Sequence, residues 1–265
     1  MRRQTGSDFI FQVFALLFSI ILVHAIYVSL IRPTANALLE EQIERQAAGE
    51  SYVVQRSFYV VLRDYEQEAC FILMLWAMAI MGMKARDGVQ ERRMLERDLL
   101  PIDYGTSVLP EDTRALSRSL ESLPENQRSL LLPRALNAAL QRFGSTRHIG
   151  DAANVVKEIC DSESDRLDSE LAMVRYIAWA IPSIGFIGTV RGIGEALGQA
   201  HRAVEGDIAG VTVSLGVAFN STFVALVLSI IIMFFTHQLQ LLQERLVLDT
   251  QGYCDDKLLK QLKAD

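Results

Sequence analysis

Four long apolar stretches divide this chain of 265 residues and limit the folds that it can adopt. They run over residues 9–31, 69–83, 176–197 and 208–236. A helix needs about 20 apolar residues to cross the hydrocarbon layer of a bilayer, so the second stretch is near the minimum and the other three suffice. Half of the residues are hydrophobic and the mean hydropathy is positive, which is uncommon for a soluble domain. We therefore expect an all-α integral membrane protein with four transmembrane helices.

The distribution of Lys and Arg predicts the orientation of these helices, because basic residues accumulate in cytoplasmic loops. Most of the 26 basic residues lie before the first stretch, between the second and the third, or after the fourth. We therefore expect a multi-pass protein whose N- and C-termini are both cytoplasmic. The net charge of −6 gives no reason to expect a nucleic-acid partner.

The same boundaries predict four parts of the chain. They are an N-terminal transmembrane hairpin (residues 1–83), a helical cytoplasmic domain (84–171), a core with the last two spans (172–236) and a cytoplasmic amphipathic helix (237–265). Arg32 and Pro33 are expected to end the first transmembrane helix, because proline disrupts a helix interior. In the cytoplasmic domain, one helix is expected to begin near Pro124 and to end at Gly144.

Small residues recur at helical spacing in both of the last two apolar stretches. In the third they are Pro182, Gly185, Thr189, Gly192 and Ala196, and in the fourth they are Gly210, Ser214, Ala218, Thr222, Ala225 and Ser229. Spacings of three and four residues place each set on one helix face. In lipid such faces let helices approach closely, so simple packing explains most of these positions.

A threonine at the centre of each small-residue face is not explained by packing alone. Thr222 lies near the middle of the fourth stretch, and Thr189 lies slightly outside the middle of the third. With Asn220 and Ser221 beside Thr222, these groups indicate either a polar ring that lines a path or hydroxyls that bond only to their own helices. The pattern leaves both interpretations open.

Charged residues are scarce inside the predicted spans, where they are costly unless paired. Arg191 and Glu195 lie one helical turn apart near one end of the third span, as an ion pair or as a gate at the mouth of a pathway. No Asp or Glu lies near the middle of any span, although a subunit that moved protons alone needs an ionisable carrier there. Either the chain does not conduct ions, or a partner helix brings the carboxylate.

The run from Glu163 to Ala196 reads ESDRLDSELAMVRYIAWAIPSIGFIGTVRGIGEA and resembles a known family. A charged helix is followed by Pro182 and then by Gly-Phe-Ile-Gly-Thr-Val-x-Gly-Ile, which is similar to the pattern of the MotA/TolQ/ExbB proton channel family. The resemblance extends over residues 161–235, and Thr222 matches the functional threonine of the family's last helix. The four-span layout resembles flagellar stator subunits, whereas the motif is closer to TolQ and ExbB.

The resemblance implies a ring of five copies in the inner membrane of a bacterial cell, with two copies of a MotB/TolR/ExbD-like single-span protein inside it. The partner helix would supply an aspartate, and the flow of protons or sodium ions past it would drive rotation. Thr189 and Thr222 would line the ion path, with Asn220 and Ser221 beside them. Helix shaping and partner packing would fall to Pro182, Gly185, Gly188, Gly192, Ala218 and Ala225. No cofactor is implied beyond the transported ion.

Two departures from the family pattern keep other functions open. Residues 210–216 carry no acid where many TolQ- and ExbB-like proteins have a glutamate, and Arg191 occupies a position that is usually small or aromatic. Both features fit a non-conducting membrane scaffold or sensor ring as an alternative. An enzyme is not expected, since no nucleophile–base pair, metal cluster or phosphate-binding loop stands out in the sequence.

Overall fold

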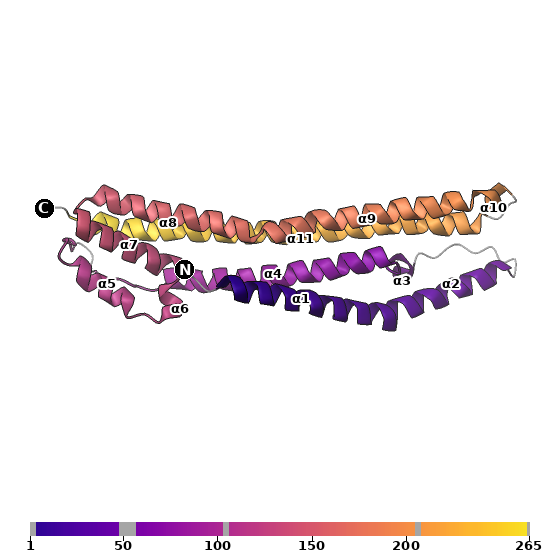
Figure 1. The fold of residues 1–265 in the computed structure, drawn as a ribbon, viewed down its shortest axis with the longest axis horizontal. Coiled ribbons are helices and arrows are strands. Elements are labelled where there is room, and N and C mark those ends of the chain that lie inside the picture. The colour runs from indigo at the N-terminus through magenta and orange to yellow at the C-terminus, as the bar shows by residue number, and fades with distance from the viewer. Residues whose placement is uncertain (1–3, 48–56, 103–105, 205–207, 264–265) are drawn as a thin grey trace. The chain divides into compact units, whose positions relative to one another are not determined.

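The computed structural model describes residues 4–47, 57–102, 106–204 and 208–263, and these ranges are almost entirely helical (Figure 1). The only extended pairing within them is one parallel bridge between Val108 and Leu262. The elements, in chain order, are α1 (Gln4–Ile26), the π-helical turn η1 (Tyr27–Ile31), α2 (Arg32–Ala47), α3 (Phe58–Val61), α4 (Tyr65–Leu95), α5 (Thr113–Glu121), α6 (Glu125–Arg128), α7 (Leu131–Thr146), α8 (Ile149–Glu170), α9 (Ala172–Gly198), α10 (Ala200–Val204), α11 (Ala209–Lys257) and the 3-10 turn η2 (Leu259–Gln261). The predicted all-α fold class is confirmed for the described part of the chain.

Four helices in these ranges are long and apolar enough to cross a membrane. With α8 and α9 taken together, their bounds are Asp8–Glu41, Tyr65–Leu95, Ile149–Gly198 and Gly210–Gln261. Each contains one of the four apolar stretches, and the short second stretch lies within the much longer helix α4. The prediction of four transmembrane helices is thus confirmed by length and composition.

The chain separates into two compact units. Within the described ranges, unit 1 comprises residues 82–172 and 237–263, and unit 2 comprises residues 4–81 and 173–236. Unit 2 therefore contains nearly all of the four apolar stretches. Unit 1 contains the charged segment between the second and third stretches and the C-terminal part of α11.

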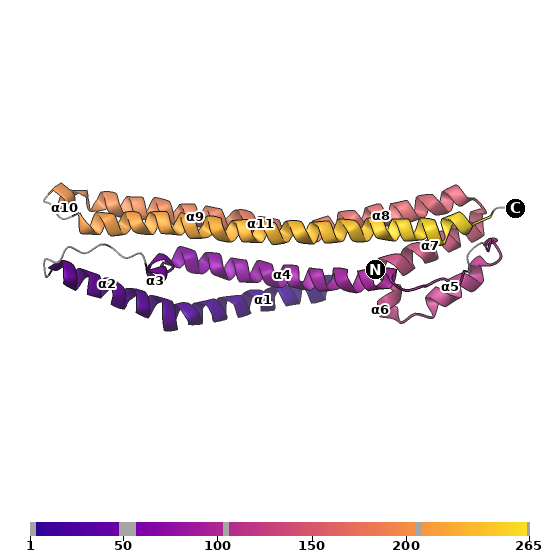
Figure 2. The same ribbon diagram turned by 180° about the vertical axis from the view of Figure 1, so that it is seen from behind.

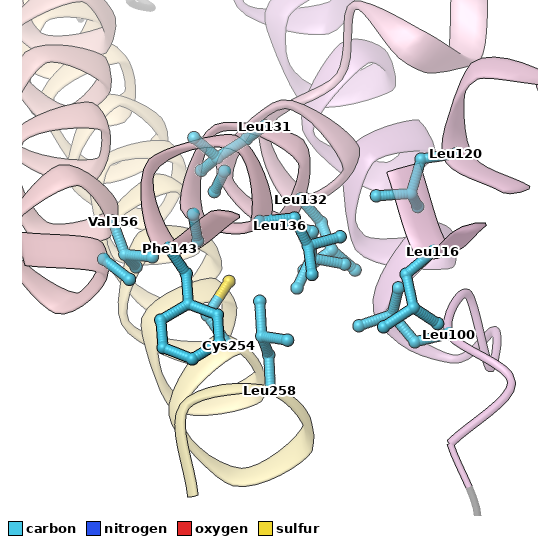
Figure 3. Packing of buried hydrophobic residues seen from close by; sticks show 14 of the residues in the cluster. Leu100, Leu116, Leu120, Leu131, Leu132, Leu136, Phe143, Val156, Cys254 and Leu258 are labelled. Carbon is cyan, nitrogen blue, oxygen red and sulfur yellow. The ribbon is translucent and has the colours of Figure 1, made fainter. Parts of the chain in front are cut away.

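Unit 1 is organised around α7, which packs against both α5 and α8. Leu132, Leu136, Leu140 and Phe143 recur every three or four residues, so one face of α7 is apolar and fully buried. Side chains from α5, α8 and the end of α11 complete the same hydrophobic cluster, as Figure 3 shows. Burial of leucine and phenylalanine side chains is the main stabilisation expected for a unit in water.

In unit 2, α1 lies beside α4, and α9 lies beside α11, in both views of the ribbon (Figures 1 and 2). The Trp76 indole donates a hydrogen bond of 2.9 Å to the carbonyl of Gln12, which ties α4 to α1. Exposed phenylalanines such as Phe9, Phe14 and Phe18 lie along α1. A helix with so much exposed apolar surface is typical of a membrane span.

The prediction that Arg32 and Pro33 end the first helix is wrong. The helix continues through η1 into α2, and the backbone N–H of Arg32 bonds to the carbonyl of Tyr27, five residues earlier. Proline has no N–H to donate to Ser29, and its ring crowds that carbonyl, so a wider π turn before Pro33 lets the helix continue. Burial of Tyr27 and Ile31 holds this turn in place.

The prediction of a single helix from Pro124 to Gly144 is also wrong. The short helix α6 precedes α7, and α7 passes Gly144 and ends at Thr146, with Arg147 following in the left-handed conformation (φ 56°). A Cβ at Gly144 would lie 2.6 Å from Thr113 Oγ1. The glycine therefore allows α5 to approach α7, which is a packing role rather than a helix stop.

Candidate functional site between α9 and α11

Helices α9 and α11 approach each other at backbone distance along their small residues. A Cβ added at Gly192 would lie 2.7 Å from the Ser214 carbonyl oxygen and 2.8 Å from the Ala218 nitrogen. Two turns earlier, a Cβ at Gly185 would collide with the Ala225 side chain. Glycine is therefore needed at both positions, and the helices meet without large side chains between them.

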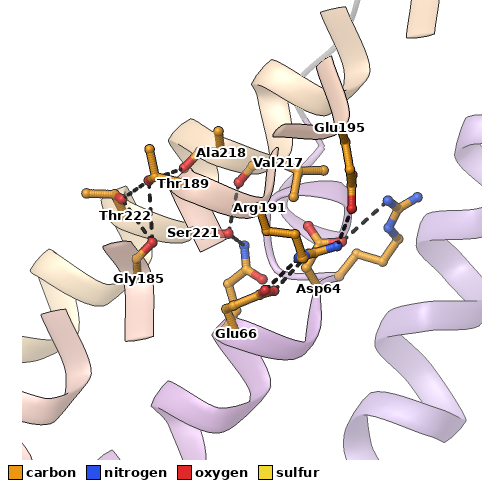
Figure 4. Close-up of polar contacts among 12 residues, drawn as sticks. Asp64, Glu66, Gly185, Thr189, Arg191, Glu195, Val217, Ala218, Ser221 and Thr222 are labelled. Atoms are coloured by element: carbon orange, nitrogen blue, oxygen red, sulfur yellow. Dashed lines mark hydrogen bonds and ion pairs between the residues drawn. The ribbon is translucent and has the colours of Figure 1, made fainter. Parts of the chain in front are cut away.

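Thr189 of α9 and Thr222 of α11 face each other across this contact (Figure 4). The Thr189 hydroxyl lies 3.0 Å from the Ala218 carbonyl oxygen, and the Thr222 hydroxyl lies 3.1 Å from the Gly185 carbonyl oxygen. Each of these carbonyls belongs to the residue four positions before the opposite threonine. The two half-buried hydroxyls thus exchange hydrogen bonds across the helices, and their oxygens also contact each other.

The two hydroxyls of this threonine pair have more than one way to share their hydrogen bonds. Each hydroxyl carries one hydrogen, but the acceptors are the two carbonyls and the opposite hydroxyl oxygen. One hydroxyl can donate to the other while the second donates to a carbonyl, so either threonine can be the donor in the contact between them. The pair therefore places two polar oxygen atoms between helices that otherwise meet through small side chains.

A proline inside α9 leaves one main-chain carbonyl without its helical partner. The carbonyl of Ala178 would accept from the N–H of residue 182, but Pro182 has none. Ser229 of α11 donates its hydroxyl to this carbonyl at 3.1 Å. Since an unpaired carbonyl is costly in the hydrocarbon layer, Ser229 compensates for Pro182 and adds a polar link between the helices.

Arg191 turns toward α4 rather than toward the threonine pair (Figure 4). Its guanidinium binds both carboxylate oxygens of Glu66, at 2.7 and 2.9 Å, and reaches Glu195 at 3.0 Å. Residues 189 and 191 lie about 200° apart around a helix of 3.6 residues per turn, so Arg191 and Thr189 occupy different sides of α9. The expected ion pair with Glu195 exists, and Glu66 is a second partner that the sequence did not indicate.

The first turn of α4 also joins other helices of unit 2. The buried Gln67 amide donates to the Ser221 hydroxyl of α11 at 3.4 Å. Glu68 contacts Arg32 at the start of α2, and its other oxygen lies 2.7 Å from His24 Nδ1. These partners lie 36 to 154 residues away in the chain. The charged residues that precede the second apolar stretch therefore give no local pattern from which their partners could be predicted.

The structure separates the four residues that were expected along an ion path. Thr189 and Thr222 form the pair, whereas Ser221 is buried on the side of α11 that contacts Gln67. A Cβ at Gly188 would lie 2.6 Å from the Ser221 hydroxyl, so this glycine allows that contact. The half-buried Asn220 side chain makes no hydrogen bond within the described ranges.

Over the same ranges, no group of three or more His, Cys, Asp or Glu could hold a metal ion.

These features define a multi-pass helical membrane protein with a polar site between two of its candidate spans. The model of the MotA/TolQ/ExbB proton channel family matches residues 127–251, just under half of the chain. This segment includes α7, α8, α9 and most of α11, and its match to the family model confirms the resemblance. No curated protein and no solved structure matches the chain.

Proposed function

We propose that the chain is the ring-forming subunit of an ion-driven stator in the inner membrane of a bacterial cell. Five copies form the ring, their N- and C-termini are cytoplasmic, and two copies of a MotB/TolR/ExbD-like single-span protein stand inside it. Inward flow of protons, or of sodium ions, past an aspartate on the partner helix drives rotation of one component against the other. Neither a cofactor nor catalysis is part of this function.

The observation that carries this proposal is the threonine pair within the segment that matches the family. Thr189 and Thr222 bring two hydroxyl oxygens together where α9 and α11 otherwise meet through small residues. The Arg191 guanidinium is bound by Glu66 and Glu195, and it lies on a different side of α9 from the threonine pair. Arg191 was one of the two features that fit a non-conducting scaffold, and its position away from the threonine pair weakens that argument.

A carboxylate from a partner helix is needed because two hydroxyls cannot carry a proton by themselves. A threonine hydroxyl stays neutral at physiological pH, so it can only contact an ion or a protonated acid. Glu66 and Glu68, in the first turn of α4, are already bound by Arg191 and Arg32. An aspartate that docks beside the threonine pair would supply the missing proton carrier.

Measurement of ion influx tests the proposal. The chain is co-expressed with its single-span partner, any periplasmic plug is removed, and cytoplasmic pH is followed under an imposed proton gradient. Thr222→Ala removes the hydroxyl, and Thr222→Ser keeps it. We expect acidification with the wild type and Thr222→Ser, and its loss with Thr222→Ala and with the partner aspartate changed to asparagine.

Thr212→Ala is a matched control for this experiment. Thr212 also lies on α11, but its hydroxyl bonds only to the carbonyl of Ile208, the residue just before this helix, at 3.0 Å. Loss of influx in this control would show that the assay reports folding rather than an ion path. Sodium uptake with the same dependence on Thr222 would change only the ion. If neither ion moves while the complex assembles, the non-conducting scaffold or sensor ring is the better description.

A further inference from the structure

An open groove lies in unit 1 between α5 and α7. It offers about 720 Å³, which is within the range of small-molecule sites. Most of its lining side chains are polar or charged, and they come from α5 and the segment just before it, from the last turns of α7 and from the residue that follows α7. The groove shares no residue with the threonine pair.

Three arginines line this groove, Arg114 and Arg118 on α5 and Arg147 after α7. Arg114 and Arg118 are four residues apart, which places them on one face of α5. None of the three has an ion pair with a residue in the described ranges, although Arg166 of the same unit binds Glu163. The three arginines outnumber the two acids of the lining, so the groove is slightly positive on a chain whose net charge is −6.

A serine in the same groove has a hydroxyl that makes no hydrogen bond within the described ranges. Ser117 lines the groove between the two α5 arginines and is only 9% exposed. Its hydroxyl bonds to nothing in the part of the chain that the structure describes, whereas the nearby Ser119 donates to the Leu116 carbonyl at 2.7 Å. The oxygen of this hydroxyl is not among the buried atoms that lack a partner, so it is accessible and can donate to a ligand oxygen in the groove.

The backbone at Arg147 is strained. Among the described residues other than glycine, Arg147 alone has a positive φ. Its N–H donates to the Phe143 carbonyl at 2.8 Å, and this hydrogen bond closes the last turn of α7. Glycine and asparagine adopt this left-handed conformation more easily than arginine does. An arginine at such a position, with its side chain lining a groove, suggests that the side chain itself is used.

We propose that the groove binds a small phosphate-bearing anion, up to the size of a nucleotide, through Arg114, Arg118, Arg147 and the Ser117 hydroxyl. Guanidinium groups present paired N–H donors that match phosphate oxygens. The serine hydroxyl donates to the same kind of oxygen and gains the partner that it lacks. This site is independent of ion flow through the membrane and gives unit 1 a ligand of its own.

Two acids limit the ligand to a compact anion. Glu111 and Glu121 also line the groove, and along the chain they flank Arg114 and Arg118. A long polyanion such as nucleic acid would extend past the arginines and meet these carboxylates, which would repel it. A small phosphate ester fits between them. An anionic lipid headgroup shares the phosphate chemistry, so the test must separate it from a soluble ligand.

Calorimetric titration of the full chain tests the site. The chain is held in phosphatidylcholine nanodiscs and titrated with inorganic pyrophosphate and, separately, with ATP. We expect saturable binding with a Kd below about 1 mM, weakened about tenfold or more by Arg118→Ala, which removes charge-assisted hydrogen bonds. Arg128→Ala is the matched control, because Arg128 is exposed on α6, has no ion pair in the described ranges and does not line the groove.

Arg147→Gly separates binding from folding. It removes a cation and relieves the left-handed strain, so binding should weaken about tenfold while the thermal unfolding midpoint stays unchanged or rises. Absence of saturable binding of both probes would overturn the proposal. Equal weakening by Arg128→Ala would also overturn it, because general electrostatic attraction would then suffice. Binding that disappears in phosphatidylglycerol nanodiscs would assign the groove to a lipid headgroup instead.

Discussion

The core of unit 1 and the α9–α11 contact of unit 2 bury different kinds of side chain, and the difference follows from their expected surroundings. Unit 1 buries large side chains such as Leu136, Leu140 and Phe143, whereas α9 and α11 in unit 2 meet through Gly185 and Gly192. In water, removal of large apolar groups from solvent is the main driving force for folding. Lipid tails are as apolar as leucine, so helices in a membrane associate through close packing and hydrogen bonds instead.

The two units also use polar groups differently. Unit 1 contains a chain of ion pairs that joins Lys84 to Glu170 at 2.9 Å, Glu170 to Arg166 at 2.7 Å, and Glu163 to both Arg166 and Arg134. The centre of the α9–α11 contact contains hydroxyls bonded to carbonyls. Hydroxyls leave that contact uncharged. We conclude that stability in unit 1 depends on bulk and charge, and that the α9–α11 contact of unit 2 depends on the absence of bulk.

The largest effect should come from removal of bulk in unit 1. Phe143→Ala deletes a ring that is 0% exposed, and we expect it to lower the free energy of unfolding by about 3–5 kcal/mol. Burial raises the pKa of the Cys160 and Cys254 thiols, which pack in the same cluster, to about 11 and about 12. Both should therefore react slowly with maleimide in the wild type and faster in the variant.

Cys70 is the internal control for this labelling experiment, with each cysteine identified by mass spectrometry. It is buried in unit 2, where its thiol lies 3.7 Å from the Ile181 carbonyl oxygen. We expect Phe143→Ala to leave its labelling rate nearly unchanged. An equal increase at all three cysteines would mean that the two units open together, which would contradict the comparison.

Addition of a single methyl group should damage unit 2. Gly192→Ala places a Cβ within 3 Å of backbone atoms of Ser214 and Ala218, which cannot move without a shift of α11. We expect a loss of about 1–3 kcal/mol and faster labelling of Cys70. Gly194→Ala is the matched control, since nothing lies within 4 Å of its added Cβ and alanine favours a helix. Equal stability of the two variants would show that the close contact does not exist.

Apolar stretches predict the spans better than they predict where helices end. The four spans follow from long local patterns that need no knowledge of neighbouring helices. The predicted ends depended on single residues, and both failed. Pro33 is accommodated by a π turn, and Gly144 provides room for Thr113 of another helix. In each case the residue's local tendency was overridden by its surroundings.

The candidate site shows the same limit. The positions of Thr189 and Thr222 within their stretches were sufficient to expect them at similar depth. The contact of Glu66 with α9 joins residues 125 positions apart, so no local pattern reveals it. Pro182 does indicate a carbonyl without a donor, but only the packing of α11 shows that Ser229 provides the donor.

The hydrogen bond from Ser229 should depend on a residue of the other helix. Ser229→Ala leaves the Ala178 carbonyl without a donor and should cost about 1 kcal/mol. Pro182→Ala restores the N–H that this carbonyl lacks, so Ser229→Ala should cost almost nothing in that background. Thermal unfolding of the four proteins of this cycle measures the coupling. Equal costs in both backgrounds would mean that Ser229 acts through packing alone.

The smallest effect should be a pH dependence of unit 1. Burial alone raises the pKa of the Glu163 carboxyl, but hydrogen bonds from Arg166 and Arg134 outweigh burial and hold that pKa below its ordinary value. Such a carboxylate stabilises the folded chain at neutral pH, and this stabilisation is lost as the pH falls through the ordinary carboxylate range. The effect is small because both arginines are partly exposed and solvent screens them.

Thermal unfolding followed by circular dichroism from about pH 7 to about pH 4 measures this dependence. The midpoint of the wild type should fall more steeply than that of Glu163→Gln, which has no charge to lose at this position. Glu158→Gln should follow the wild type, because Glu158 is exposed and has no ion pair in the described ranges. If the midpoint of Glu163→Gln falls as steeply as that of the wild type, the ion pairs of Glu163 do not stabilise unit 1, and its stability rests on apolar burial.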